Sequence, residues 1–452
     1  MKRTVLLLAL MTGGLGRSGW AQDAVIKSVG GPKAKIAIPD FRGAGETAQL
    51  MSAFNQTLFS DVQNSGLFEM AGKSLYPLVT PQQPSDFQEP GPGAATAGRR
   101  APWLTDWSSP PVSAKYLAFG YAAAQNNEIV LSGWLFDVNQ ASVAGAQVFG
   151  KRYLGPVNED GARKVAHEFA ADIIARLGGE TLFGSHIYFV SDRTGNKEIW
   201  SMDYDGSNQK QITHYRNTCI TPSVSPDGTK LAFTTFASGN PGIYVFSLET
   251  GRKLSFYNPK ASLNATPNFT PDGNHILFAS SVNGFTNIFM ANPDGSQLQR
   301  ISTTRKIEVE PKVNPKTGTD IVYVSGRSGP QQIWRMSIDG TDNTMLTTGE
   351  GDASNPSWHP NGQIIAFSWT RGFEPGNFNI FLMDVASRSI QAQLTHGTGR
   401  NENPNWGPDG RHLVFASNRK GNAMQIFTML ADGTQVQQLT TQGRNTMPVW
   451  GK

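Results

Sequence analysis

The sequence predicts a small α/β amino-terminal domain followed by an all-β six-bladed propeller. A proline-led segment recurs six times at intervals of 44 to 48 residues, at Pro222, Pro267, Pro311, Pro356, Pro404 and Pro448. Isoleucine followed by an aromatic residue interleaves with it six times, from Ile199-Trp200 to Ile426-Phe427. Units of about 45 residues with four short strands are typical of propeller blades.

The residues that follow each proline support this interpretation. The first five proline segments lead into β-branched and aromatic runs, such as Leu231-Ala232-Phe233 and Ile365-Ala366-Phe367, which favour short strands. Pro-Asp-Gly or Pro-Asn-Gly separates segment and run in four repeats, with glycine where a tight hairpin needs a positive φ. Each repeat therefore begins with a tight hairpin.

The two ends of the array are complementary halves of one blade. The array opens at Ile187-Tyr188-Phe189 without a proline strand and ends at Trp450 with only that strand. We expect the last strand, 448–451, to pair with the three strands within 187–213. An open array would leave unpaired backbone groups at both ends, so this pairing closes the ring.

Upstream of the repeats, residues 22–180 show the mixed periodicity of an α/β domain, and the propeller occupies 185–452. Apolar residues recur at helical spacing in 46–64 and again from Val165 to Leu177. Strands are expected at 35–39, 116–121, 129–138 and 148–153. A stretch rich in Pro, Gly, Ala and Gln, about 77–112, is expected to be a flexible insertion.

The first residues predict export. Lys2 and Arg3 precede a short apolar run, and small residues then lead to Ala21. This pattern indicates a signal peptide at 1–21 that is cleaved near Ala21. The apolar run is shorter than the roughly 20 residues that span a bilayer, so we expect a soluble mature chain that touches membranes only through partners.

Charge and cysteine content narrow the function classes. The whole chain carries a formal charge of +4, and removing the leader with Lys2, Arg3 and Arg17 leaves +1. A duplex-binding surface needs clustered Lys and Arg, whereas here the charges are interspersed, so we expect no nucleic-acid partner. The single cysteine, Cys219, cannot form an intrachain disulfide and is expected to be a small buried side chain.

Catalytic signatures are missing. The sequence has no Gly-x-Ser-x-Gly motif and no remaining stretch of some 200 residues for a hydrolase domain. His167-Glu168 begins like a zinc motif, but Asp172 stands near where the second histidine belongs, and His167 is expected on the surface. We therefore expect no catalytic residue, no metal ligand and no cofactor. Paired carboxylates on a propeller face could still act as acid and base, which keeps a periplasmic hydrolase as an alternative.

A candidate binding site lies where the proline strands begin. The strand nearest the axis carries the first hairpin of each blade, so the residues before the prolines should converge on one channel mouth. They are Thr221, Thr266, Glu310, Asn355, Asn403 and Met447, with Asn264, Glu308, Asn401 and Asn445 two positions before four of them. They predict a polar socket that accepts a partner loop, or a cation such as calcium through Glu308 and Glu310. The simpler interpretation of any one of them is a strand start or turn cap.

These features resemble the TolB family. The repeats are similar to its WD40-like Pro-Asp repeats, and the stretch from Ser60 to Phe68 resembles the end of its first helix. The resemblance implies a monomeric, non-enzymatic periplasmic scaffold of the Tol-Pal system. Its propeller would bind a peptidoglycan-associated lipoprotein of the Pal type, and its amino-terminal part would contact a TolA-like inner-membrane protein.

The match to the TolB family is incomplete at two places in the chain. The amino-terminal arm, 22–33, is shorter than the arm with which TolB relatives engage TolA. Glu310 matches a glutamate in the corresponding blade of the family, whereas Leu263 stands where a relative has histidine. Besides the hydrolase, the remaining alternative is a structural envelope propeller without Tol partners.

Overall fold

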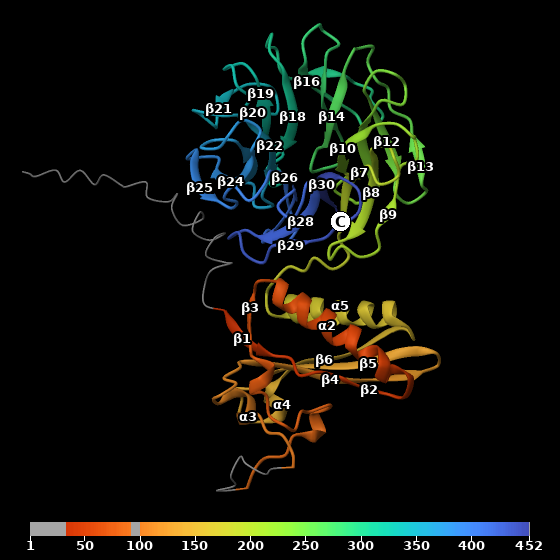
Figure 1. Ribbon diagram of the computed structural model, residues 1–452, viewed down its shortest axis with the longest axis vertical. Helices are drawn as coiled ribbons and strands as arrows, with labels where there is room; N and C mark the ends of the chain where they lie inside the picture. The colour runs from red at the N-terminus through yellow and green to blue at the C-terminus, as the bar shows by residue number, and fades with distance from the viewer. Residues whose placement is uncertain (1–32, 92–99, 452) are drawn as a thin grey trace, which may run out of the picture.

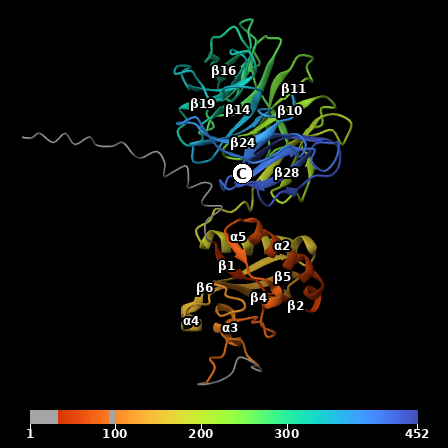
Figure 2. The ribbon, with the colours of Figure 1, turned by 60° about the vertical axis from the view of Figure 1, so that its left-hand side comes forward.

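The computed structural model describes residues 33–91 and 100–451 and has two parts, an α/β domain and a propeller (Figures 1 and 2). The predicted signal peptide and nearly all of the amino-terminal arm lie outside the described residues. Residues 177–185 connect the two parts. Within the described ranges, no helix is both long and apolar enough to cross a membrane.

The α/β domain is built on a mixed sheet in the order β3-β1-β4-β5-β6, with β2 also pairing with β4. Pairings among β1, β2, β3 and β4 are parallel, whereas β4, β5 and β6 form an antiparallel meander. The strands are β1 (Ala34–Ala37), β2 (Arg42–Ala44), β3 (Phe68–Met70), β4 (Tyr116–Gln125), β5 (Glu128–Asp137) and β6 (Gln147–Pro156). The α-helices are α2 (Met51–Asn64), α3 (Thr105–Ser108), α4 (Val143–Ala146) and α5 (Glu159–Arg176), with 3-10 turns η1 (Gly45–Leu50), η2 (Lys73–Leu75) and η3 (Pro84–Asp86).

Helices α2 and α5 lie side by side between the sheet and the propeller (Figure 1). Their fully buried residues include Phe54, Leu58, Phe169 and Ile173, which recur at the predicted helical spacing. Burying a side chain of this size contributes about 1.5–3 kcal/mol, so these contacts hold the helices on the sheet. Asn158 begins α5 by accepting a hydrogen bond from the Gly161 amide at 2.8 Å.

The opposite face of the sheet is covered by the stretch that the sequence predicts to be flexible, and that prediction is corrected for the described residues. Phe87, Leu104, Trp107 and Val112 are buried against Phe119 and other residues of β4 and β5. The sheet would otherwise expose its second apolar face to water, which explains why this stretch is packed. Residues 92–99 lie outside the described residues.

The propeller consists of six four-stranded antiparallel sheets around an axis (Figure 1). Blade 1 contains β30 (Asn445–Gly451), β7 (His186–Ser191), β8 (Glu198–Asp203) and β9 (Lys210–Gln211). Blade 2 contains β10 (Cys219–Val224), β11 (Lys230–Thr235), β12 (Gly242–Ser247) and β13 (Arg252–Leu254). Blade 3 contains β14 (Asn264–Phe269), β15 (Ile276–Ser280), β16 (Asn287–Ala291) and β17 (Gln299–Arg300).

The remaining three blades repeat this order. Blade 4 contains β18 (Glu308–Val313), β19 (Asp320–Ser325), β20 (Gln332–Ser337) and β21 (Thr344–Met345). Blade 5 contains β22 (Ala353–Trp358), β23 (Ile364–Trp369), β24 (Asn379–Asp384) and β25 (Ser389–Gln393). Blade 6 contains β26 (Asn401–Trp406), β27 (His412–Ser417), β28 (Gln425–Leu430) and β29 (Gln437–Gln438).

The carboxy-terminal strand closes the ring, as predicted. β30 pairs antiparallel with β7, with Trp450 opposite Ile187 and Asn445 opposite Ser191. The Trp450 indole is buried and donates a hydrogen bond to the Ser185 hydroxyl at 2.9 Å. Blade 1 therefore joins both ends of the array.

Antiparallel pairing places the loops of each blade alternately on two faces of the propeller. One face carries the loops between the first and second strands and between the third and fourth strands of each blade. We call it the proximal face. The α/β domain packs there: Gln435 Nε2 in one such loop donates a hydrogen bond to the Gln63 carbonyl at the end of α2. The distal face carries the loops between second and third strands and those between blades. Each innermost strand runs from the distal to the proximal face.

Candidate partner-binding site

The six residues that precede the strand prolines share an unusual backbone conformation. Each has a φ between 51° and 56°, in the left-handed region that residues other than glycine seldom adopt. Each also lies at a shift in the pairing of the first and second strands of its blade, as between Ile220 and Ser223 in blade 2. The following proline has no amide hydrogen to pair, so a bulge fits at this point. A residue other than glycine in this conformation costs about 1–3 kcal/mol, so each blade has a strained bulge at the same point.

These six residues converge on the propeller axis, as the sequence predicts. They line a cavity of about 70 Å³, which we call the axial socket. Its lining residues are Thr221, Pro222, Thr266, Pro267, Glu310, Lys312, Asn355, Pro356, Asn403, Pro404, Asn405, Met447, Pro448 and Val449. Glu310 and Lys312 are the charged residues among them, and both come from β18 of blade 4. The socket is otherwise neutral.

Hydrogen bonds between neighbouring blades hold the socket in shape. The Glu310 amide donates to Thr266 Oγ1 at 3.2 Å, and the Asn355 amide donates to Glu310 Oε2 at 2.7 Å. The Asn355 side chain adds a bond to Glu310 Oε1 at 3.1 Å. Burial raises the pKa of Glu310, and the bonds from Asn355 and the nearby Lys312 charge oppose that rise. Glu310 therefore links blades 4 and 5 in addition to lining the socket.

The four residues two positions earlier do not line the socket, which corrects their assignment to the channel mouth. They are buried, and each bonds to the end of the second strand or to the following loop of its own blade. Glu308, Asn401 and Asn445 also bond to the third strand of the preceding blade, through Asn287, Asn379 and Gln425. Glu308 pairs with Arg327, Asn401 accepts from Arg419 at 2.7 Å, Asn445 accepts from Arg193 at 3.2 Å, and Asn264 accepts from Ser280 at 2.7 Å. The three arginines also lie over aromatic rings of the same blades.

The same contacts bear on the predicted cation site. Glu308 is committed to Arg327, whereas Glu310 is bonded to Asn355, so the two glutamates belong to different networks. Among the residues that the structure describes, no group of three or more His, Cys, Asp or Glu side chains is arranged to hold a metal ion. A cation at Glu310 therefore stays a prediction that lacks its second ligand.

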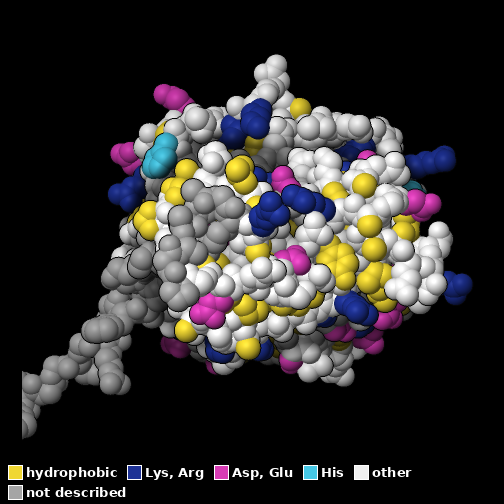
Figure 3. Space-filling view, turned by 90° about the horizontal axis from the view of Figure 1, so that it is seen from below, with side chains coloured by type: hydrophobic (Ala, Val, Ile, Leu, Met, Phe, Trp, Pro, Cys, Tyr) yellow, Lys and Arg dark blue, Asp and Glu magenta, His cyan; other side chains and the backbone are white. Residues whose placement is uncertain are grey.

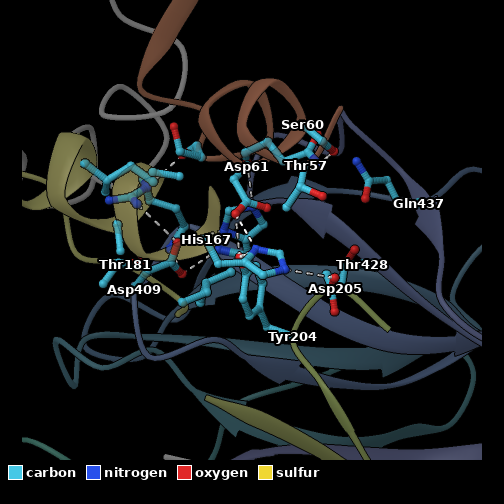
Figure 4. A pocket seen from close by; sticks show the side chains of 18 of the residues that line it. Thr57, Ser60, Asp61, His167, Thr181, Tyr204, Asp205, Asp409, Thr428 and Gln437 are labelled. Carbon is cyan, nitrogen blue, oxygen red and sulfur yellow. Dashed lines mark hydrogen bonds and ion pairs between the residues drawn. The ribbon is translucent and has the colours of Figure 1, made fainter. Parts of the chain in front are cut away.

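A larger cavity of about 220 Å³ lies between the α/β domain and the propeller. The sequence interpretation of His167 as a surface residue is wrong, because this side chain lies in that interface with Asp61 and Tyr204 (Figure 4). His167 Nδ1 is 2.6 Å from Asp61 Oδ2, which also accepts a hydrogen bond from the Tyr204 hydroxyl at 2.8 Å. His167 Nε2 is 3.6 Å from Asp205 Oδ2.

The charges in this cluster are coupled. Burial raises the pKa of Asp61, although His167 and Tyr204 oppose the rise. Burial alone would lower the pKa of His167, but the hydrogen bond and charge of Asp61, together with Asp205 and Asp203, raise it. Burial and the neighbouring carboxylates raise the pKa of Tyr204 well above its usual value. The cluster therefore favours a proton held between His167 and Asp61.

A second group of contacts in the interface receives the end of helix α2. Arg411 Nε donates to the Ser65 carbonyl at 3.1 Å, and His412 Nε2 lies 2.8 Å from the Asn64 carbonyl. Asp409 holds both side chains, through an ion pair of 3.3 Å with Arg411 and a hydrogen-bond contact of 2.7 Å with His412 Nδ1. The last carbonyls of a helix lack partners within it, so the propeller satisfies groups that the helix leaves open. Sequence reasoning missed this contact, because its two halves stand more than 340 residues apart.

Comparison with known proteins agrees with this architecture. The family model described as PD40, TolB beta propeller domain, matches residues 175–374 and 350–452, more than half of the chain. A crystal structure of TolB from Acinetobacter baumannii is similar over 93% of this chain and 97% of that chain, with a TM-score of 0.74. At 22% sequence identity, this likeness shows the fold alone.

Curated relatives match a shorter part of the sequence. A protein TolB homolog from Chlorobium luteolum is 33% identical over 234 residues, 52% of this chain and 51% of the relative. The Tol-Pal system protein TolB of Bordetella pertussis is 32% identical over 203 residues, 44% of this chain and 45% of the relative. The chain thus spans about half the length of the curated relatives it matches. With the family model matched across all six blades, the chain belongs to the TolB beta propeller family.

Proposed function

We propose that this chain is a non-enzymatic periplasmic scaffold of the Tol-Pal system that links an outer-membrane lipoprotein to the inner-membrane Tol complex. This role would support outer-membrane integrity and cell division. The name of the Bordetella pertussis relative supports the choice of system, and the predicted signal peptide at 1–21 supports the compartment. The lipoprotein would be a Pal-like peptidoglycan-associated protein, and the inner-membrane partner would be TolA-like.

The observation that carries the proposal is the axial socket. Six equivalent residues, all in a strained backbone conformation, are brought together from six blades at one neutral pocket. A folding requirement alone would be met by glycine at these positions, since glycine adopts a positive φ without strain. Retained side chains in such a place favour a surface that contacts a partner loop.

Other features favour a binding role over catalysis. The interdomain cluster contains a histidine, a carboxylate and a tyrosine, but the raised pKa of Tyr204 makes it a poor nucleophile near neutral pH. Cys219 is fully buried, and burial raises the pKa of its thiol to about 12. Neither group therefore suits covalent catalysis.

The surface charge of the α/β end also favours protein partners. The end of the molecule that Figure 3 shows carries basic and acidic side chains interspersed with one another. That view contains no continuous basic surface of the kind that a nucleic-acid duplex needs.

The test is a binding measurement between the mature chain and the purified soluble domain of the Pal-like protein from the same organism. We expect a specific one-to-one complex that leaves the contacts between the α/β domain and the propeller intact. A pull-down from periplasmic extract would identify a TolA-like partner independently. Absence of binding to the Pal-like domain at high micromolar concentration would contradict the proposal, and reproducible ester, peptide or glycoside hydrolysis would favour the hydrolase alternative.

A further inference from the structure

Lys312 is the only cationic side chain of the axial socket and has no close partner there. Among the described residues, its ammonium group makes no hydrogen bond and no close ion pair, although its backbone carbonyl accepts from the Trp358 indole at 2.9 Å. The neighbouring Glu310 is already bonded to the amide and side chain of Asn355. Lys312 is half-buried, and an ammonium group without a protein partner on the channel wall suits a ligand that supplies an anion.

The direction in which the pKa of Lys312 is shifted agrees with the lack of an anionic partner. Burial lowers the pKa of Lys312, and the charge of Glu310 only partly opposes that effect. A carboxylate brought next to the ammonium would stabilise its charged form.

The two propeller faces differ in charge in a way that points to the same ligand. The loops of the distal face carry twelve lysines and arginines against four aspartates and glutamates, whereas those of the proximal face carry three against nine. Exposed distal examples are Lys197, Arg216, Lys260, Arg305, Lys420 and Arg444. Exposed proximal carboxylates such as Asp227 accept hydrogen bonds within their own turns, so they serve the fold. Many of the distal lysines and arginines make no hydrogen bond of this kind within their own turns.

This asymmetry matters because the six left-handed residues of the socket lie in the distal half of the innermost strands, whereas Lys312, the fifth of the six residues of β18, lies deeper in the channel. Each left-handed residue is the third of its strand, counted from the distal end. An approaching segment with negative charge would therefore be attracted by the distal loops before it reaches Lys312. Such complementarity increases association rates and specificity more than it increases affinity.

We propose that the axial socket binds a protein segment through a carboxylate that accepts a hydrogen bond from Lys312 Nζ, with the basic distal loops guiding the segment to it. The cavity of about 70 Å³ has room for a few water molecules or one short side chain, so a loop tip fits and a folded surface does not. The carboxylate belongs to an Asp or Glu side chain or to a chain terminus. This inference deepens the proposed function, because it rests on the socket as a partner site.

The experiment uses the mature chain and three fluorescein-labelled dodecapeptides of glycine and serine, titrated at low salt. The first has a central Asp and an amidated end, the second has Asn in place of Asp, and the third has a neutral interior and a free carboxyl end. Wild type should bind the carboxylate peptide at least tenfold more tightly than the Asn peptide. The third peptide distinguishes a terminal carboxylate from a side-chain carboxylate.

Variants assign the effect to one side chain. Lys312→Met should lose the preference for the carboxylate, whereas Lys312→Arg should keep it. Lys420→Met, which removes an exposed distal cation outside the socket, should keep the preference and slow association at low salt only. Equal binding of the Asp and Asn peptides by wild type, a preference that survives in Lys312→Met, or no binding of any peptide at millimolar concentration would overturn the inference. A Pal-like domain that fails to bind would contradict the proposed function and leave the peptide result unaffected.

Discussion

The axial socket and the interdomain cluster are two polar cavities of the same chain, and they are built by opposite means. The socket uses one backbone position six times, mostly with neutral side chains, and its shape depends on a closed ring. The interdomain cluster uses single charged residues such as Asp61 and His167, each of which occurs once. A repeated element thus forms a channel mouth of fixed shape. Single charged pairs instead form a contact whose strength depends on pH.

Opening the ring should have the largest effect and should destroy the socket while it leaves the α/β domain folded. We expect deletion of Pro448–Lys452 to lower stability by at least about 5 kcal/mol, since loss of one buried tryptophan alone costs about 3–5 kcal/mol. The exposed edge of β7 should also promote association. Calorimetry and light scattering would check this, with a chain that lacks only Lys452 as control. A monomeric truncated chain with an unchanged melting temperature would contradict ring closure by β30.

Removing one charge from the interdomain cluster should have the next largest effect, and it should uncouple the two parts. Asp61→Asn removes the negative charge that His167 and Tyr204 share and replaces one acceptor oxygen with an NH2 donor, which should cost about 2–4 kcal/mol. We expect the single calorimetric transition to separate into two. Asp40→Asn, which removes an exposed partner of Lys73 in the same domain, is the matched control and should change stability by less than about 1 kcal/mol. Equal shifts in the two variants would show that the cluster does not join the domains.

The same cluster should make the stability of wild type depend on pH. Because the pKa of His167 is raised in the folded state, its contribution is fully present below the unfolded value of about 6.5 and is lost as pH rises through the folded value. Burial lowers the pKa of His359. Its contribution to stability is therefore present above about pH 6.5 and is lost as the pH falls below that value. Denaturant unfolding from pH 6.5 to 9 should therefore show falling stability in wild type and a flatter profile in His167→Gln. Parallel profiles would contradict the assignment.

The sequence predicts the repeated positions of the socket better than it predicts the single charged residues of the interdomain cluster. The spacing of the six prolines predicted blades, closure and the convergence of Thr221 and Asn403, because a repeat places equivalent residues at equivalent points. It could not separate Glu310 in the socket from Glu308 in its arginine pair, since a bulge between them changes which way each side chain points. His167 and Arg411 escaped prediction because their partners come from the other domain.

The smallest stability effect, and the sharpest test of the socket, comes from Asn403. This residue has a φ of 53°, and its amide donates to Ser368 Oγ at 3.2 Å. Asn403→Gly removes the side chain and keeps a backbone that tolerates positive φ, whereas Asn403→Ala removes it and adds strain of about 1 kcal/mol. Both should weaken binding of a Pal-like domain at least tenfold, with the melting temperature nearly unchanged in the glycine variant.

This pair is preferable to changes at Glu310, whose loss would also break the link between blades 4 and 5. Calorimetric melting and titration of the same samples would separate strain from contact. If only the alanine variant binds weakly, the backbone conformation and not the side chain governs the site. If both bind like wild type while a proximal-face variant does not, the partner binds on the opposite face of the propeller, and the neutral side chains of the socket serve the ring alone.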